Sequence, residues 1–186
     1  MRRRPSKIPQ RKRIFVGCEG ESERSYIALL QQLLGRNTEF QLVAEVLNGG
    51  DPLALIESAE KALRRDRALA RDAFFERFVI LDADLRGRAI HRDDSCIRLA
   101  QELSIRLVWQ EPSHEAVLLR HLPDCEQRRP PSSRESEEQL RAQWPGYVKN
   151  FGRDKLSERI DATALRRVRR YEPSLAVLLE LIGLID

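Results

Sequence analysis

Residues 14–23 read IFVGCEGESE and predict a short apolar strand, an acidic turn and the start of a helix. The run from Ile14 to Cys18 has the length and composition of a buried strand. Gly20 permits a tight turn, and Ser22 can cap the helix that follows. Open α/β folds bind their ligands beyond the carboxyl ends of parallel strands. Glu19, directly after this strand, therefore marks one half of a candidate site.

The second half of this site is formed by Asp82 and Asp84, which follow the apolar run Phe78 to Leu81. Because side chains alternate along a strand, we expect the two aspartates to point the same way. Carboxylates that lie close together repel unless a cation or a proton lies between them. Their oxygens suit Mg²⁺ or Mn²⁺, which keep several waters and bridge to phosphates. We expect Glu19 to complete this metal site, with Glu23, one helical turn deeper, within reach of the same pocket.

Both acidic motifs also have a simpler interpretation. Aspartates often end strands as turn formers and helix caps, and a single Glu-Gly pair carries less information still. The joint placement of the acids after the first and third apolar strands favours the metal site over caps and turns.

Strands and helices alternate along the first part of the chain. Helical spacing of apolar residues extends from Tyr26 to Leu34, and a second strand is expected over Phe40 to Leu47. Asp51-Pro52 predicts a helix start with the aspartate as N-cap. A further helix is expected from about Asp94 to Leu103, and a fourth strand from Ile105 to Trp109. This order predicts an α/β fold with a central parallel sheet of about four strands and helices on both faces.

The chain divides into four predicted parts. Residues 1–12 form a basic arm that is expected to be disordered and can attract nucleic acid phosphates. Residues 13–123 form the α/β core. Residues 124–143 are polar and are expected to form a mobile loop. Residues 144–186 form a C-terminal helical extension that packs on the core.

Two helices are expected in the C-terminal extension, roughly over Asp154 to Arg170 and Pro173 to Leu181. A short helix is also expected from Ser113 to Leu122, entered through Pro112.

Composition limits the class of protein. The chain has 186 residues, a net charge of +4 and 33% charged residues, which fits one soluble globular domain. Three separated cysteines without a CxxC pair exclude a cysteine-based zinc site of the usual spacing and a disulfide framework. No apolar run approaches the roughly 20 residues of a membrane span, and no signal-like apolar core follows the basic N-terminus. A reducing, cytoplasmic location without membrane contact is therefore the default expectation.

Three stretches carry a resemblance to a known family. Val16 to Tyr26, VGCEGESERSY, resembles the opening of RloB-like proteins, an apolar strand followed by Cys-Glu-Gly-x-Thr-Glu and an aromatic residue. Pro112 to His121, PSHEAVLLRH, resembles the family's element of Pro, Glu and a Leu-rich helix ending in His. Tyr147 to Lys149 resembles its later Tyr-x-Lys. The sequence departs at Ser22, where Thr is usual, and at His114, where an aromatic is frequent.

The resemblance covers roughly residues 13–160 and implies membership of the Toprim group, which includes the OLD-type nucleases. It implies a compact Rossmann-like fold with a Glu after the first strand and an Asp-x-Asp after the third. Glu19, Asp82 and Asp84 match those positions, and Glu23 matches the second Glu of the OLD-like variant. The resemblance thus implies a nuclease that depends on Mg²⁺ or Mn²⁺ and acts in bacterial defence against phage or other foreign DNA.

Further residues are candidates for the same chemistry. The family match favours Glu115 as a metal ligand or general base over an exposed first-turn Glu. Lys149 is a candidate for stabilising transition-state charge, with a surface lysine as the equal alternative. His114 and His121 lie seven apart on one helix face, and His91 is expected in a loop. Zinc ligation would need more such residues, so we interpret the histidines as surface residues or phosphate contacts. Three basic residues beyond the Asp pair are candidates for holding a phosphodiester backbone, with a solvated loop as the alternative: Arg86, Arg88 and Arg92.

Nucleic acid is the expected partner, with DNA favoured over RNA, and a homodimer is compatible with the sequence. The alternative function is a non-catalytic metal- and phosphate-binding module that acts on nucleic acid with a partner ATPase or helicase. The chain has no G-x-x-x-x-G-K-[ST] loop, so another chain would have to supply ATP hydrolysis. In a third, structural interpretation, the acidic residues are caps and turns only.

Overall fold

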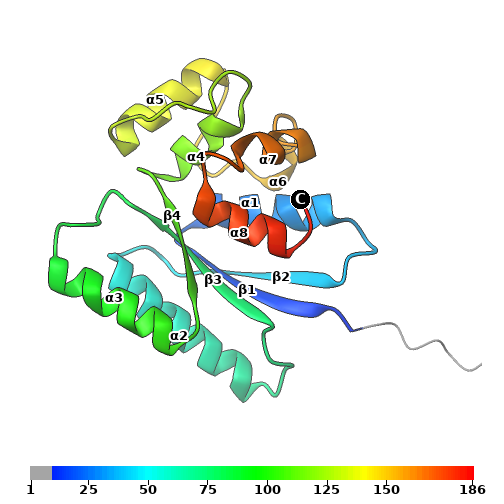
Figure 1. The fold of residues 1–186 in the computed structure, drawn as a ribbon, viewed down its shortest axis with the longest axis vertical. Coiled ribbons are helices and arrows are strands. Elements are labelled where there is room, and N and C mark those ends of the chain that lie inside the picture. The colour runs from blue at the N-terminus through cyan, green and yellow to red at the C-terminus, as the bar shows by residue number, and fades with distance from the viewer. Residues whose placement is uncertain (1–9) are drawn as a thin grey trace, which may run out of the picture.

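A four-stranded parallel sheet lies at the centre of the computed structural model, which describes residues 10–186 (Figure 1). The strands lie in the spatial order β2-β1-β3-β4, and every neighbouring pair is parallel. Their bounds are β1 (Lys12–Cys18), β2 (Phe40–Val46), β3 (Glu76–Asp82) and β4 (Arg106–Gln110). The predicted α/β class with a parallel sheet of about four strands is confirmed, and the arrangement is Rossmann-like.

Helices cover both faces of the sheet (Figure 1). One face carries α2 (Pro52–Ala68) and α3 (Ile90–Glu102). The other carries α1 (Glu21–Leu34), α4 (His114–His121) and the C-terminal helices. Two clusters of buried apolar residues result, because alternate side chains of each strand point to opposite faces. In the part of the chain that the structure describes, no helix is both long enough and apolar enough to cross a membrane.

The N-cap of the first helix lies two residues earlier than predicted. Gly20 is the N-cap of α1, and its backbone N–H donates to Glu23 Oε2 at 3.0 Å. Ser22 lies inside the helix, so its predicted role as cap was wrong. Asp51 does cap α2, accepting a hydrogen bond from the Ala54 amide at 3.0 Å.

The prediction of a mobile loop over residues 124–143 was wrong, because this segment contains helix α5 (Ser133–Gln143). Ser132 caps this helix and accepts from the Glu135 amide at 3.2 Å. Leu140 is fully buried, yet it is the only large apolar residue within the helix. One anchoring residue gives no helical periodicity, which is why the sequence pattern missed α5.

The predicted helix over 154–170 is in fact two short helices, α6 (Arg153–Leu156) and α7 (Ala162–Val168). Asp161 starts the second by accepting from the Ala164 amide at 2.8 Å. The last helix, α8 (Pro173–Leu181), is confirmed at its predicted bounds. The helix predicted from Asp94 begins earlier, at Ile90, so His91 and Arg92 are helical rather than in a loop.

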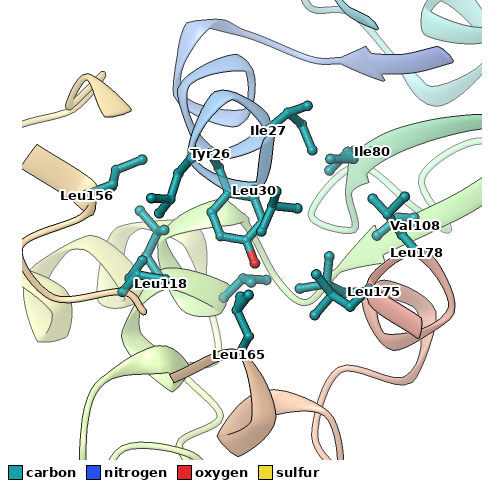
Figure 2. Packing of buried hydrophobic residues seen from close by; sticks show 14 of the residues in the cluster. Tyr26, Ile27, Leu30, Ile80, Val108, Leu118, Leu156, Leu165, Leu175 and Leu178 are labelled. Atoms are coloured by element: carbon teal, nitrogen blue, oxygen red, sulfur yellow. The ribbon is translucent and has the colours of Figure 1, made fainter. Parts of the chain in front are cut away.

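The C-terminal helices complete the core on the α1 face of the sheet. Figure 2 shows leucines of α6, α7 and α8 gathered around Tyr26 of α1, together with Ile80 of β3 and Val108 of β4. Tyr26 is fully buried, as its helical spacing predicted. Residues 1–9 of the predicted basic arm lie outside the described residues, whereas its last residue, Lys12, already belongs to strand β1.

A buried histidine is part of this core. His121 has no exposed surface, which overturns its predicted surface or phosphate-contact role. Its Nε2 lies 3.0 Å from the Tyr26 hydroxyl and its Nδ1 lies 2.8 Å from the Val117 carbonyl oxygen. Nδ1 therefore donates to the carbonyl, and Nε2 accepts from the tyrosine. Burial lowers the pKa of His121 to about 4.

We expect this histidine to make the fold acid-sensitive. Its folded pKa lies below its unfolded pKa, so its contribution is fully present above pH 6.5 and is lost as pH falls toward 4. The loss amounts to about 3 kcal/mol. Denaturant unfolding between pH 7 and pH 4 should show this slope in the wild type and a shallower one in His121→Gln. His91→Gln, at an exposed position on α3, is the control and should keep the wild-type slope.

We expect strand β1 to need glycine at position 17, because Leu47 and Val79 pack closely against the backbone there. A methyl group there would lie 2.8 Å from Leu47 Cδ1 and 3.0 Å from Val79 Cγ2, and both neighbours are buried. Gly17→Ala should therefore lower the free energy of unfolding by about 1–3 kcal/mol, measured by denaturant titration. Gly152→Ala, where the added methyl meets open space at φ −68°, should change it by less than about 0.5 kcal/mol. Equal stability of the two variants would contradict the packing argument.

Candidate active site

The two predicted halves of the site meet at the middle of the sheet. Glu19 follows β1 and Asp82 ends β3, and these strands are direct neighbours. The backbone N–H of Asp82 donates to Glu19 Oε2 at 3.4 Å. From β1 the chain moves outward to β2 on one side, and β3 and β4 fill the other side. This is the topological switch point at which open α/β sheets bind ligands.

Two further glutamates face this point from helices. Glu23 lies in the first turn of α1 and is 6% exposed, with its Oε2 held by the Gly20 amide. Glu115 lies in the first turn of α4 and is 5% exposed. Its Oε2 accepts from Ser113 Oγ at 3.0 Å, and its Oε1 lies 3.8 Å from Lys149 Nζ. The first turn of a helix favours a carboxylate, because the helix dipole is positive there.

Asp82 is the residue most perturbed by this crowding. Burial is the largest cause that raises the pKa of Asp82, and the charges of Glu19, Glu23, Glu115 and Asp84 add to it. Together they raise this pKa to about 9. Within residues 10–186, its buried Oδ1 has no hydrogen-bond partner. The site therefore holds an unpaired carboxyl oxygen among four acids.

The pKa of Glu19 is raised for related reasons. Burial is the largest cause, and the charges of Glu23 and Asp84 add to it. The hydrogen bond from the Asp82 amide and the positive charge of Lys149 act in the opposite direction. Lys149 thus lies near enough to act on two of the acids, although its side chain is 66% exposed.

Asp84 is placed differently from the sequence prediction. Strand β3 ends at Asp82, so strand alternation does not set the direction of Asp84, which lies exposed in the turn that follows. Its Oδ2 accepts from Ser133 Oγ at 3.0 Å, at the start of α5. Its charge still raises the pKa of both Asp82 and Glu19. Asp84 is therefore the solvent-facing member of the acidic group.

The acidic group fits a hard divalent cation in its chemistry. Its donors are all carboxylate oxygens, one of them buried and without a partner in the described part of the chain, and their mutual repulsion would be relieved by positive charge. Among the described residues, however, no three His, Cys, Asp or Glu side chains stand in an arrangement that could hold a metal ion. The residues present would hold one through Glu19, Asp82 and Asp84, after side-chain adjustment.

The predicted nucleic acid contacts are only partly available. His114 is 1% exposed, with Nδ1 2.8 Å from Gln110 Nε2, so its prediction as a nucleic acid contact was wrong. Arg92 is exposed but makes a two-pronged ion pair with Asp51, at 2.8 and 2.9 Å. Its guanidinium is therefore already engaged by a carboxylate.

The other two arginines lie on the exposed turn after Asp84. The guanidinium of Arg86 lies over the Trp109 ring, 4.9 Å from its centroid. Arg88 is exposed and has no ion pair within residues 10–186. It is the arginine of this turn that is freest to meet a phosphate.

Helix α4, which carries Glu115, is fixed by a buried ion pair. Arg120 Nε bonds Glu172, the N-cap of α8. The same guanidinium donates to the carbonyl oxygens of Glu111, at 2.8 Å, and Arg128, at 3.2 Å. One side chain thus joins α4 to α8 and to the segments before and after α4. This network holds Glu115 at the edge of the sheet.

Tyr147 is a site neighbour that the sequence argument treated only as part of a motif. It is 3% exposed, and its hydroxyl has no hydrogen-bond partner in the described part of the chain. Burial and the charge of Glu115 raise its pKa. Ser113 and Ser133 were also missed, because an isolated serine carries no signal until its partner is known.

Comparison with known proteins identifies a family. A family model described as RloB-like protein matches residues 14–175. No curated protein and no solved structure matches the chain.

We expect Asp82→Asn to stabilise the ion-free protein at pH 8. Because the pKa of Asp82 is raised on folding, the wild type loses stability as pH rises from about 4 toward 9. The amide has no proton to take up on folding, so the free energy of unfolding should rise by about 1–3 kcal/mol in chelator-treated protein. Asp84→Asn, at an exposed position, is the control and should change stability far less. A less stable Asp82→Asn would contradict the crowding described above.

Proposed function

Because this chain belongs to the RloB-like family, we propose that it is a metal-dependent nuclease of the Toprim kind that hydrolyses phosphodiester bonds of nucleic acid. The observation that carries the proposal is Asp82 Oδ1, which is buried without a hydrogen-bond partner within residues 10–186 and lies among four other acids at the switch point of a parallel sheet. Such a site is short of positive charge, and a divalent cation beside a phosphate supplies it.

Each acid has a distinct part in this proposal. Mg²⁺ or Mn²⁺ would be held by Glu19, Asp82 and Asp84, and would supply activation of water and neutralisation of the charge on the phosphate. Glu23 is held by the Gly20 amide and takes part in a second ion position. Glu115 is oriented by Ser113 and serves as the acceptor for the proton of the attacking water.

The exposed basic residues around the acids position the strand. Lys149 Nζ lies 3.8 Å from Glu115 Oε1, and its side chain is exposed to solvent. It can therefore stabilise the negative charge that develops on the phosphate. Arg88 and Arg86 lie on the turn after Asp84 and contact the flanking backbone. DNA as the substrate, cytoplasmic location and a role in defence against foreign DNA are proposed on the family resemblance alone.

The alternative is a module that binds metal and nucleic acid phosphates without cutting, and that acts with a partner ATPase or helicase. The exposed Lys149 and Arg88 beside the acids support it, because they can hold a phosphate whether or not the bond is cut. Calorimetric titration with Mn²⁺ and a cleavage assay together separate the two proposals. Binding of Mn²⁺ without cleavage supports the module, and absence of Mn²⁺ binding contradicts both proposals.

The nuclease proposal predicts ion-dependent cleavage by the purified full chain. Plasmid, single-stranded DNA and RNA are incubated with the protein in Mg²⁺ or Mn²⁺. Glu19→Gln and Asp82→Asn should lower the cleavage rate by at least about 100-fold, because each removes an ion ligand. Glu21→Gln is the matched control, since Glu21 lies between Glu19 and Glu23 but is exposed and paired with Arg24 at 2.8 Å.

Loss of activity in these variants must not come from unfolding. Asp82→Asn is expected to be at least as stable as the wild type, so its inactivity would report on chemistry. Cleavage that persists in both Glu19→Gln and Asp82→Asn would place the activity elsewhere on the protein or in a contaminant.

A further inference from the structure

A cavity of about 310 Å³ lies at the amino end of the sheet, opposite the acidic site. The C-terminal half of α2, the segment that leads into β3 and the end of α3 form its wall. Figure 1 shows α2 and α3 side by side on this face. None of the residues that line the cavity belongs to the acidic group.

The wall of this cavity is basic. Four arginines line it against two carboxylates: Arg64, Arg67, Arg71 and Arg77, with Glu60 and Asp66. Both carboxylates are already neutralised by arginine.

The partners of these carboxylates are close. Asp66 receives two hydrogen bonds from Arg13, at 2.7 and 2.9 Å, and a third from Arg71 at 3.4 Å. Glu60 is paired with Arg64 at 2.6 Å. Within residues 10–186, Arg67 and Arg77 have no ion pair. The cavity therefore keeps positive charge that the described protein does not balance.

Arg77 is prepared to receive an acceptor. Its Nη1 donates to the Leu103 carbonyl oxygen at 2.6 Å, which fixes the guanidinium at the wall. Its Nε is buried and, in the part of the chain that is described, has no hydrogen-bond partner. The guanidinium thus keeps unused donor capacity, and an anionic oxygen in the cavity would engage it through Nη2, for which the described residues supply no acceptor. Arginine presents donors in the planar pattern that phosphate oxygens match.

The remaining wall is apolar and firmly held. This part of the wall is formed by four apolar residues: Leu63, Ala73, Phe74 and Leu103. The Arg13 guanidinium lies 4.2 Å from the Phe74 ring centroid, and Phe15 packs on the same ring at 5.4 Å between centroids. An occupant thus needs a non-polar or aromatic body as well as an anionic group. The volume is at the lower end of small-molecule sites.

We propose that this cavity binds a small organic phosphate of about mononucleotide size. The phosphate lies against Arg67 and Arg77, and the base or other apolar body lies against Leu63 and Phe74. The proposal does not depend on the nuclease site, because the cavity lies at the other end of the strands. It gives the protein a ligand site separate from its nucleic acid substrate.

Calorimetry of the purified full chain with AMP tests the proposal, with inorganic phosphate as the second probe. We expect saturable 1:1 binding of AMP and at least tenfold weaker binding of inorganic phosphate, which lacks the apolar body. Arg67→Gln should weaken AMP binding at least tenfold. Arg166→Gln is the matched control, because Arg166 is an exposed helical arginine that, like Arg67, has no ion pair within residues 10–186, and it lies on α7, away from the cavity.

Backbone amide NMR locates the ligand. AMP should shift the amide signals of Leu63, Ala73 and Leu103 and leave those of Glu19 and Asp82 unchanged. Absence of saturable binding, equal affinity of wild type and Arg67→Gln, or shifts confined to the acidic edge would each overturn the proposal. Tighter binding of a 5′-phosphorylated oligonucleotide than of AMP, with the same amides shifted, would overturn the small-ligand assignment. Arg77→Gln serves as a second variant once its thermal unfolding shows that it is folded.

Discussion

Repulsion among carboxylates at the end of β1 and β3 is the constraint around which the rest of the fold is arranged. Within residues 10–186, one buried carboxyl oxygen of Asp82 has no hydrogen-bond partner, and burial together with the charges of Glu19, Glu23, Glu115 and Asp84 raises its pKa. Such a group lowers stability, so it persists only where the surrounding structure holds it in place. The central strands and the first turns of α1 and α4 do so here. Crowded, desolvated acids of this kind are typical of functional sites.

The buried polar contacts of the C-terminal half explain how Glu115 is held there. Arg120 joins α4 to the cap of α8, and His121 joins α4 to Tyr26 of α1. Both side chains are buried, so each depends on having its partners in place. The helices after residue 143 therefore do more than cover apolar surface. They fix the angle at which α4 presents its first turn to the sheet edge.

The two ends of the sheet differ in charge. Carboxylates gather at the carboxyl ends of the strands, whereas arginines surround the cavity at the amino ends. The buried strands keep these groups apart, so an anion drawn to the basic cavity does not meet the acidic site directly. Only the acidic end lies at the switch point where the fold itself favours ligand binding.

The sequence by itself determined the elements whose signals are local. Short apolar runs predicted the four strands, Asp51-Pro52 predicted the start of α2, and leucine spacing predicted α1 and α8. Helix α5 escaped detection because Leu140 is its single large apolar anchor. The identity of the acids at the sheet edge also came from local sequence, since each follows a strand or begins a helix.

Only the tertiary structure decided which of these residues meet. The strand order places β1 beside β3, and that adjacency brings Glu19 to the Asp82 amide across 63 positions of sequence. Packing buried His114 and His121, which residue type alone had suggested for the surface. Arg92 forms an ion pair with Asp51, the N-cap of a different helix, α2. Pairing, burial and neutralisation are properties of pairs of residues distant in sequence, so no local pattern can report them.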